Sequence, residues 1–181
     1  MQGVWARAFL PVTDGLFRPL FAFFVVELAT RRVVHVGATR HSTDAWVAQQ
    51  LREATPCDRH PRYLIRDNDG TFGAAYARVA AASWIEVPRA PHRAPRANAV
   101  CARRLGSARR ECLGHLLILG ERQLPRVLRE YVAYFNHTRP HQGIGQAIPE
   151  GSPPERPASV GGRVVAIPVL GGLHHDYRRV G

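Results

Sequence analysis

The sequence predicts an α/β fold in which helices flank a mixed five-stranded sheet, followed by a C-terminal β-hairpin extension. Three extended apolar segments follow one another near the start of the chain, and later strands alternate with helical patterns. Strands separated by helices need crossover connections, which make that part of the sheet parallel. Two further extended segments flank a Gly-Gly step near the end of the chain, which is typical of a hairpin.

The first three strands are predicted as a meander. Residues 8–12 and 20–26 are extended and apolar, and Thr13, Asp14 and Gly15 between them indicate a turn. Residues 33–37 are rich in β-branched side chains and form the third strand. Neighbouring strands joined by short turns pair antiparallel, so this part of the sheet is antiparallel.

Helices and strands then alternate. Ser42 or Thr43 caps a helix that runs to Glu53. A short strand ends at Asp67, an alanine-rich helix covers residues 72–82, and residues 84–87 form the fifth strand. A long helix from about residue 98 to 117 and a helix over 124–136 complete the order. The last helix carries four apolar side chains on one face: Leu128, Tyr131, Val132 and Phe135.

Composition divides the chain into three parts. Residues 1–148 form the core domain, residues 149–162 form a linker rich in Pro, Gly and Ser, and residues 163–181 form the hairpin. Gly171 and Gly172 would make a two-residue turn, and Pro168 limits its strand to an edge position. An isolated hairpin is marginal in water, so we expect it to pack on the body or on another chain.

The basic residues indicate the class of partner. The formal net charge is +11, and all 25 basic residues are arginine. Guanidinium groups pair bidentately with phosphate, which favours a nucleic-acid partner. The alternative is a basic surface without a specific partner.

The cysteines and the apolar runs indicate the compartment. The three cysteines, Cys57, Cys101 and Cys112, are an odd number without a CxxC pair, as expected in a reducing cytoplasm. The most apolar run, residues 20–26, is too short to span a bilayer, and no signal peptide is readable. We therefore expect a cytoplasmic protein that does not associate with membranes.

Asp67 is the first candidate for a functional residue. The apolar strand Tyr63–Ile65 leads directly into Asp67, Asn68, Asp69 and Gly70. Ligands and metals collect beyond the carboxyl ends of strands in open α/β sheets, so Asp67 is a candidate metal ligand. The alternative is a polar turn without a function, which such clusters also form.

Four segments together resemble a known family. Residues 23–35, 67–70, 98–106 and 134–141 are similar to the retroviral-integrase-type catalytic core of bacterial insertion-sequence transposases. The resemblance covers roughly residues 8–150. Its most specific part is Asn136-x-x-Arg139-Pro140-His141 followed by Ile148-Pro149.

The resemblance implies a ribonuclease-H-like fold and DNA strand transfer in DNA integration and transposition. In such cores three carboxylates hold two divalent cations, Mg²⁺ or Mn²⁺, which clamp the attacking and leaving oxygens of a phosphoryl displacement. The family places one carboxylate on the first strand, one at the end of the fourth strand and a Glu on the following long helix. Asp67 matches the second position.

The other two ligand positions hold alanine. Alignment with the family places the first carboxylate at Ala8 and the Glu at Ala102, 35 residues after Asp67. One carboxylate cannot position two Mg²⁺ ions, so the resemblance predicts a catalytically degenerate core in which metal binding is lost. Asp14 and Glu111 are poor replacements, because the first is six residues from Ala8 and the second lies on another helix face.

DNA binding needs different residues. Arg96, Arg103 and Arg110 recur every seven residues and share a helix face. The full candidate DNA-binding set is Arg93, Arg96, Arg103, Arg104, Arg110 and Arg139. The alternative is a solvated helix face. Asn136 and His141 either contact DNA or shape the active site, or they belong to a segment that only ends the helix at Pro140.

Three functions remain open from the sequence, beside a pseudogene product that has no selected role. The first is a degenerate transposase core that binds DNA, as a homo-oligomer or with an intact transposase. The second is a non-catalytic DNA-binding or oligomerising protein that modulates an intact transposase. The third is an active phosphoryl-transfer enzyme with rewired ligands, which would require Asp14 or Glu111 to lie close to Asp67.

Overall fold

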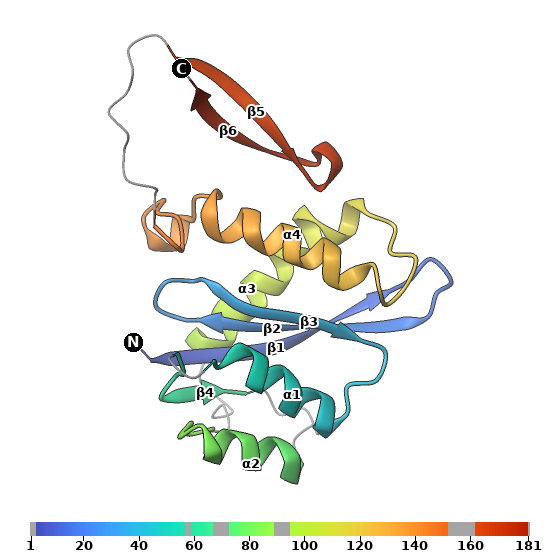
Figure 1. Cartoon of the computed structure of the whole chain (residues 1–181), viewed down its shortest axis with the longest axis vertical. Helices are drawn as coiled ribbons and strands as arrows, with labels where there is room; N and C mark the ends of the chain where they lie inside the picture. Colours follow the sequence, from blue (N-terminus) through green and yellow to red (C-terminus); the bar gives the residue numbers. More distant parts are fainter. Residues whose placement is uncertain (1–2, 57–58, 67–72, 89–94, 152–161, 181) are drawn as a thin grey trace.

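The computed structural model describes residues 3–56, 59–66, 73–88, 95–151 and 162–180, with residues 95–99 described by their backbone only. In this part of the chain a mixed sheet lies between two pairs of helices, and a separate hairpin lies beyond one pair (Figure 1). The expected α/β class and the mixed sheet are confirmed. None of the described helices is long and apolar enough to cross a membrane.

The sheet consists of β1 (Val4–Thr13), β2 (Pro19–Glu27), β3 (Val33–Thr39) and β4 (Tyr63–Ile65) in the order β3-β2-β1-β4. The pairs β1–β2 and β2–β3 are antiparallel, as the predicted meander requires. Strand β4 pairs parallel with β1, with Val4 opposite Tyr63 and Ala6 opposite Ile65. The carboxyl end of β4 therefore lies beside the middle of β1.

The predicted fifth strand is wrong. Residues 84–87 make a single parallel bridge, Tyr63 to Glu86, so the sheet has four strands. Trp84, the first residue of the segment, has a left-handed backbone conformation (φ 55°), which turns the chain there. Pro88 follows and has no N–H to donate, so the extended stretch is too short to form a ladder.

Helices α1 (Asp44–Ala54) and α2 (Ala74–Ala82) cover one face of the sheet (Figure 1). The hydroxyl of Thr43 accepts a hydrogen bond from the N–H of Trp46 at 3.2 Å, so Thr43 is the cap of α1. Val47 and Leu51 pack with Phe23 and Val25 of the sheet in a buried cluster. Burial of this face stabilises the layer through the hydrophobic effect.

Asp44 joins the two helices of this layer. Its carboxylate accepts hydrogen bonds from the N–H groups of Gly73, Ala75 and Tyr76 at 2.9, 2.8 and 3.0 Å. Burial raises the pKa of Asp44, but these three bonds and the charge of Arg78 together outweigh it, and the net pKa is lowered. A carboxylate from α1 thus caps the N-terminus of α2, where the helix dipole favours negative charge.

Helices α3 (Pro95–Glu111) and α4 (Leu124–His137) cover the other face, joined by a short 3-10 turn at Leu113–His115. Six buried side chains of these helices and of Cys112, which directly follows α3, belong to the core cluster on this face of the sheet: Ala108, Cys112, Leu124, Leu128, Tyr131 and Phe135. The expected extent of the first of these helices, to residue 117, is wrong. Cys112 leaves helical geometry (φ −129°, ψ −71°), which ends α3 at Glu111.

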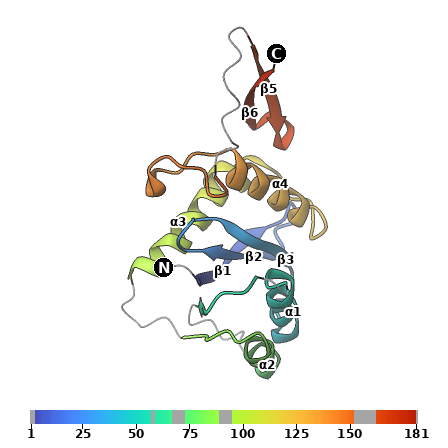
Figure 2. The ribbon, with the colours of Figure 1, turned by 60° about the vertical axis from the view of Figure 1, so that its left-hand side comes forward.

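The hairpin consists of β5 (Arg163–Val169) and β6 (His174–Val180). The connection is the four-residue segment 170–173 rather than the predicted two-residue turn, and Leu170 has a left-handed backbone conformation (φ 52°). Only the turn end of the hairpin contacts α4 closely, and both strands project beyond it (Figures 1 and 2). The N–H of Leu170 donates to Glu130 at 2.5 Å, and His174 stacks on Tyr134 at 4.7 Å between ring centroids.

Candidate functional site

Helix α3 lines two pockets, of which the first lies against the sheet. This alanine pocket has a volume of about 220 Å³. Its lining consists of Ala6, Arg7, Ala8, Ile65, Arg66, Cys101, Ala102 and Leu105.

The register of the sheet explains why these residues meet. Ala6 and Ala8 lie on the same face of β1, because successive side chains of a strand alternate between faces. Ile65 pairs with Ala6 across the parallel β1–β4 ladder, so the end of β4 opens onto this face. Cys101 of α3 is buried and packs with Ala6 and Ala8. The three elements that carry the ligand positions in the resembled family therefore converge here.

The described side chains of the alanine pocket do not fit a divalent cation. They offer methyl and other alkyl groups, one thiol and the guanidinium groups of Arg7 and Arg66. Mg²⁺ and Mn²⁺ require carboxylate, carbonyl or water oxygens, and a guanidinium repels them. Within the described ranges, no group of three or more His, Cys, Asp or Glu side chains could hold a metal ion. Asp67, the predicted metal ligand, lies outside the described residues.

Asp14 belongs to a different part of the molecule. Its buried carboxylate accepts hydrogen bonds from the guanidinium groups of Arg40 at 2.5 Å and Arg18 at 3.1 Å, and from the N–H of Leu16 at 3.0 Å. The Arg40 bond lowers the pKa of Asp14 most, burial opposes it, and the bonds from Arg18 and Leu16 lower it further. Asp14 is six residues beyond Ala8 on an extended strand, about 20 Å along it. It secures the β1–β2 turn.

Glu111 is also committed elsewhere. Its carboxylate accepts from Nη2 of Arg139 at 2.6 Å and from the hydroxyl of Tyr131 at 3.1 Å. It lies nine residues beyond Ala102 on α3, about 13 Å along the helix axis. Neither proposed replacement carboxylate lines the alanine pocket.

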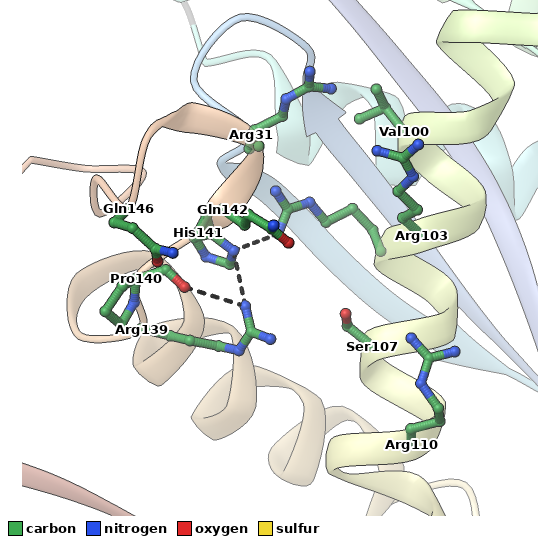
Figure 3. A pocket seen from close by; sticks show the side chains of 12 residues that line it. Arg31, Val100, Arg103, Ser107, Arg110, Arg139, Pro140, His141, Gln142 and Gln146 are labelled. Carbon is green, nitrogen blue, oxygen red and sulfur yellow. Dashed lines mark hydrogen bonds between the residues drawn. The ribbon is translucent and has the colours of Figure 1, made fainter.

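The second pocket lies between α3 and the segment after α4 (Figure 3). This arginine pocket has a volume of about 350 Å³. Its lining consists of Arg31, Val100, Arg103, Arg104, Ser107, Arg110, Arg139, Pro140, His141, Gln142, Gly143 and Gln146. Five of these side chains are guanidinium groups, and none of the lining residues is a carboxylate.

His141 holds two of the arginines together. It is 4 % exposed, and its Nε2 lies 3.1 Å from the carbonyl oxygen of Phe135. A carbonyl can only accept, so the ring proton is on Nε2 and Nδ1 is an acceptor. Nη1 of Arg139 and Nη1 of Arg104 donate to this Nδ1 at 2.9 and 3.1 Å (Figure 3).

The ring of Phe135 forms the floor beneath this group. The Cζ atoms of Arg104 and Arg139 lie 4.3 and 5.5 Å from its centroid, and the His141 ring centroid lies 4.2 Å away. Cations are attracted to the face of an aromatic ring, so Phe135 partly offsets the cost of gathering the guanidinium groups.

The pKa values of Arg104 and His141 reflect burial most and the surrounding positive charge less. Burial lowers the pKa of Arg104 to about 10, with further contributions from Arg31 and Arg139. Burial also lowers the pKa of His141 to about 4; the hydrogen bond to Phe135 opposes this, and the neighbouring arginines add to it. His141 is therefore neutral at physiological pH, while the guanidinium groups around it remain charged.

The structure brings together four of the six arginines predicted to bind DNA: Arg103, Arg104, Arg110 and Arg139. Arg93 lies outside the described residues, and the side chain of Arg96 is not described. The sequence did not indicate Arg31, which reaches the pocket from the β2–β3 turn. Asn136 has a structural role, because its amide bonds both the N–H and the carbonyl of Val33, at 3.0 and 2.8 Å.

Comparisons with known proteins identify similar sequences and folds. The family model described as "Integrase core domain" matches residues 77–149. This range includes α3, α4 and most of the arginine pocket. The comparison with curated protein sequences gave no match.

Several solved retroviral integrase structures are similar to the chain. The catalytic core domain of HTLV-2 integrase in complex with magnesium, in its trimeric form, superposes with a TM-score of 0.63 at 11 % identity, over 81 % of this chain and 93 % of that one. The BIV integrase catalytic core domain gives 0.59 at 16 % identity, over 83 % and 92 %. A chain of the simian T-cell lymphotropic virus intasome gives 0.65 at 11 % identity, over 100 % and 68 %. The fold is therefore the ribonuclease-H-like α/β fold of integrase catalytic cores.

Proposed function

We propose that this chain is a transposase- or integrase-type core that binds DNA but has lost the metal site for strand transfer. The observation that carries the proposal is the alanine pocket. The end of β4, the middle of β1 and one face of α3 converge there, and the two positions expected to supply carboxylates are Ala8 and Ala102. The resemblance of the sequence to bacterial insertion-sequence transposases supports the narrower assignment to that group.

The arginine pocket supports the retained binding function. DNA offers closely spaced phosphates, and arginine side chains on one surface bind them without sequence selectivity. The five guanidinium groups of the arginine pocket lie on the same helix as Ala102 or on segments that contact it. The proposal therefore separates binding, which is kept, from metal-dependent catalysis, which is lost.

Metal titration by calorimetry tests the loss of catalysis. The native chain and the double variant Ala8→Asp plus Ala102→Glu are each titrated with Mg²⁺ and Mn²⁺. We expect no binding by the native chain and binding by the double variant. Adding Asp67→Asn to the double variant is the matched control and should abolish the gain. Micromolar binding of two ions by the native chain, lost on Asp67→Ala, would contradict the proposal.

DNA binding is measured separately, by fluorescence anisotropy with a labelled duplex across a range of salt concentrations. We expect affinity that falls steeply with salt, because arginine–phosphate contacts release counterions. The absence of binding at low salt would overturn the binding half of the proposal.

An oligomeric form is a further part of the proposal. The similar structures include trimeric and dimeric forms of the HTLV-2 integrase core. We propose that this chain self-associates or joins an intact transposase, which would let it modulate the active enzyme. Light scattering of the chain, alone and mixed with an active transposase that resembles it, measures the mass of each species. A monomer in both samples would contradict this part.

A further inference from the structure

The arginine pocket has features that a surface used only for general charge attraction does not need. Arg31, Arg104 and Arg139 come from the β2–β3 turn, from α3 and from the end of α4, which are far apart in sequence. Mutual repulsion between their charges disfavours this arrangement in the chain alone. Glu111 contacts one of these arginines, because its carboxylate accepts a hydrogen bond from Nη2 of Arg139. Glu111 is not among the residues that line the pocket.

Two of these three guanidinium groups, those of Arg104 and Arg139, are also held in position. Arg104 and Arg139 donate to one nitrogen of a buried neutral His141, and both lie over the ring of Phe135. Side chains that are already ordered lose less conformational entropy when a ligand binds. Such ordered side chains are typical of a binding site for a single chemical group of a ligand, whereas a basic surface that only attracts charge has flexible side chains.

The size and lining of the arginine pocket indicate which chemical group it could bind. Its volume of about 350 Å³ equals that of roughly twelve water molecules, at about 30 Å³ each. This is enough for one phosphate and part of a sugar, but not for a duplex. Ser107, Gln142 and Gln146 add neutral hydrogen-bonding groups at the wall. Guanidinium forks match the oxygens of a phosphate bidentately.

We propose that the arginine pocket is a binding site for a single phosphate group of a nucleic acid, held between Arg31, Arg104 and Arg139. The proposal rests on the proposed function, because it names the contact through which that function binds DNA. The phosphate comes from one of two sources, an internal phosphodiester or a strand end that carries a terminal phosphate. Both present the same oxygens to the arginines.

The first experiment uses the full chain and inorganic phosphate as the probe. Phosphate should raise the melting temperature of the native chain more than chloride does at equal ionic strength. We expect Arg104→Gln to lose this increase. Arg126→Gln, on the exposed side of α4 and outside the pocket, removes one charge as the matched control and should keep it. Equal phosphate effects in Arg104→Gln and the native chain would overturn the proposal.

A second variant keeps the test decisive if Arg104→Gln does not fold. Arg31→Gln removes a pocket charge but leaves both hydrogen bonds to His141 in place. It should reduce the affinity for phosphate at least fivefold while circular dichroism shows a native fold. An unchanged affinity in this folded variant would contradict the proposal.

Oligonucleotides separate the two sources of phosphate. A single-stranded oligonucleotide with a 5′-phosphate is compared with the same strand lacking it, and with a closed duplex hairpin. Tighter binding of the phosphorylated strand, lost in Arg31→Gln, assigns the pocket to strand ends. Equal loss of affinity for all three probes assigns it to internal phosphodiesters. If the native chain binds DNA and Arg31→Gln binds it equally well, the phosphate site is wrong while the proposed function stands; if the native chain binds no DNA, the proposed function itself is wrong.

Discussion

The alanine pocket and the arginine pocket differ in chemistry although α3 lines both. Ala102 and Leu105 face the first pocket, and Arg103, Arg104 and Ser107 face the second. Residues one or two positions apart on a helix point in different directions, so each face can change without the other. The two pockets show that one face of α3 can be uncharged while the neighbouring face carries a cluster of arginines.

Alanine at both positions is also compatible with the fold. Alanine has the highest helix propensity of all residues, so Ala102 favours α3. Ala8 is 5 % exposed and packs with Cys101, and a methyl group can be buried there without a hydrogen-bonding partner. The loss of the metal site that we propose therefore need not weaken the packing.

The largest effect is expected at the floor of the arginine pocket. Phe135 is 1 % exposed, belongs to the buried cluster between the sheet and α4, and supports Arg104 and Arg139. Phe135→Ala should lower the free energy of unfolding by about 4 kcal/mol. Urea denaturation measures the change, with Phe17→Ala, at a side chain 90 % exposed, as the control. A loss below 1 kcal/mol would show that the floor is not part of the core.

The second effect concerns pH. The pKa of His141 is about 4 in the folded chain, against an ordinary value of 6.5, so the unfolded chain binds a proton first as the pH falls. The contribution of neutral His141 to the free energy of unfolding is complete above pH 6.5 and is lost as the pH falls through 4. The free energy of unfolding should drop by about 3 kcal/mol over this window.

His141→Gln provides the comparison for this pH effect. Glutamine can donate to the Phe135 carbonyl and accept from an arginine, but it does not titrate. The difference between the native chain and His141→Gln in the pH dependence of the free energy of unfolding separates the contribution of His141 from those of the other titratable groups. Parallel pH dependence in both proteins would contradict the assignment of a neutral, buried imidazole.

A smaller effect is expected for an exposed arginine of the same pocket. Arg103→Gln should weaken binding of duplex DNA a few-fold and reduce the slope of log affinity against log salt by about 0.9, the value for one phosphate contact. Anisotropy titrations at several salt concentrations measure the slope, and Arg126→Gln should leave it unchanged. An identical slope in native chain and Arg103→Gln would remove Arg103 from the DNA-binding set.

The smallest effect belongs to the alanine pocket. Ala102 is exposed on α3, so Ala102→Glu alone should change the free energy of unfolding by less than about 0.5 kcal/mol. Thermal and urea unfolding both measure it. A loss above 2 kcal/mol would mean that the position is packed more tightly than its exposure indicates, and the double restoration could not then be interpreted as a simple return of ligands.

Local patterns explain which parts of the fold were predictable. Leu128, Tyr131 and Phe135 are spaced so that they share one face of a helix, and all three are buried as predicted. Thr43 as a cap and the first three strands likewise depend on neighbouring residues. The prediction of a strand over residues 84–87 was wrong, although their β-branched and aromatic content favours one. The backbone conformation of Trp84 limits the segment to one bridge.

The candidate sites were predictable only in part, because they depend on contacts between distant segments. The heptad spacing of arginines indicated a charged face of α3, and Arg103 and Arg110 do line one pocket. Nothing local marks Arg31 as their neighbour, since the β2–β3 turn meets α3 only in the folded chain. The pairing of Asn136 with Val33 spans 103 residues, so the sequence could not distinguish its structural role from DNA contact.

The carboxylate of Asp44 also couples the stability of the two helices in one layer. Helix α2 has nine residues, and isolated helices shorter than about 12 residues are marginal in water. Its N-cap position is Gly73, which offers no side-chain acceptor, so the first amides of α2 depend on a group carried by α1. The stability of α2 is therefore coupled to the presence of α1. In native-state hydrogen exchange, opening of α1 should expose the amides of both helices together, as one cooperative unit.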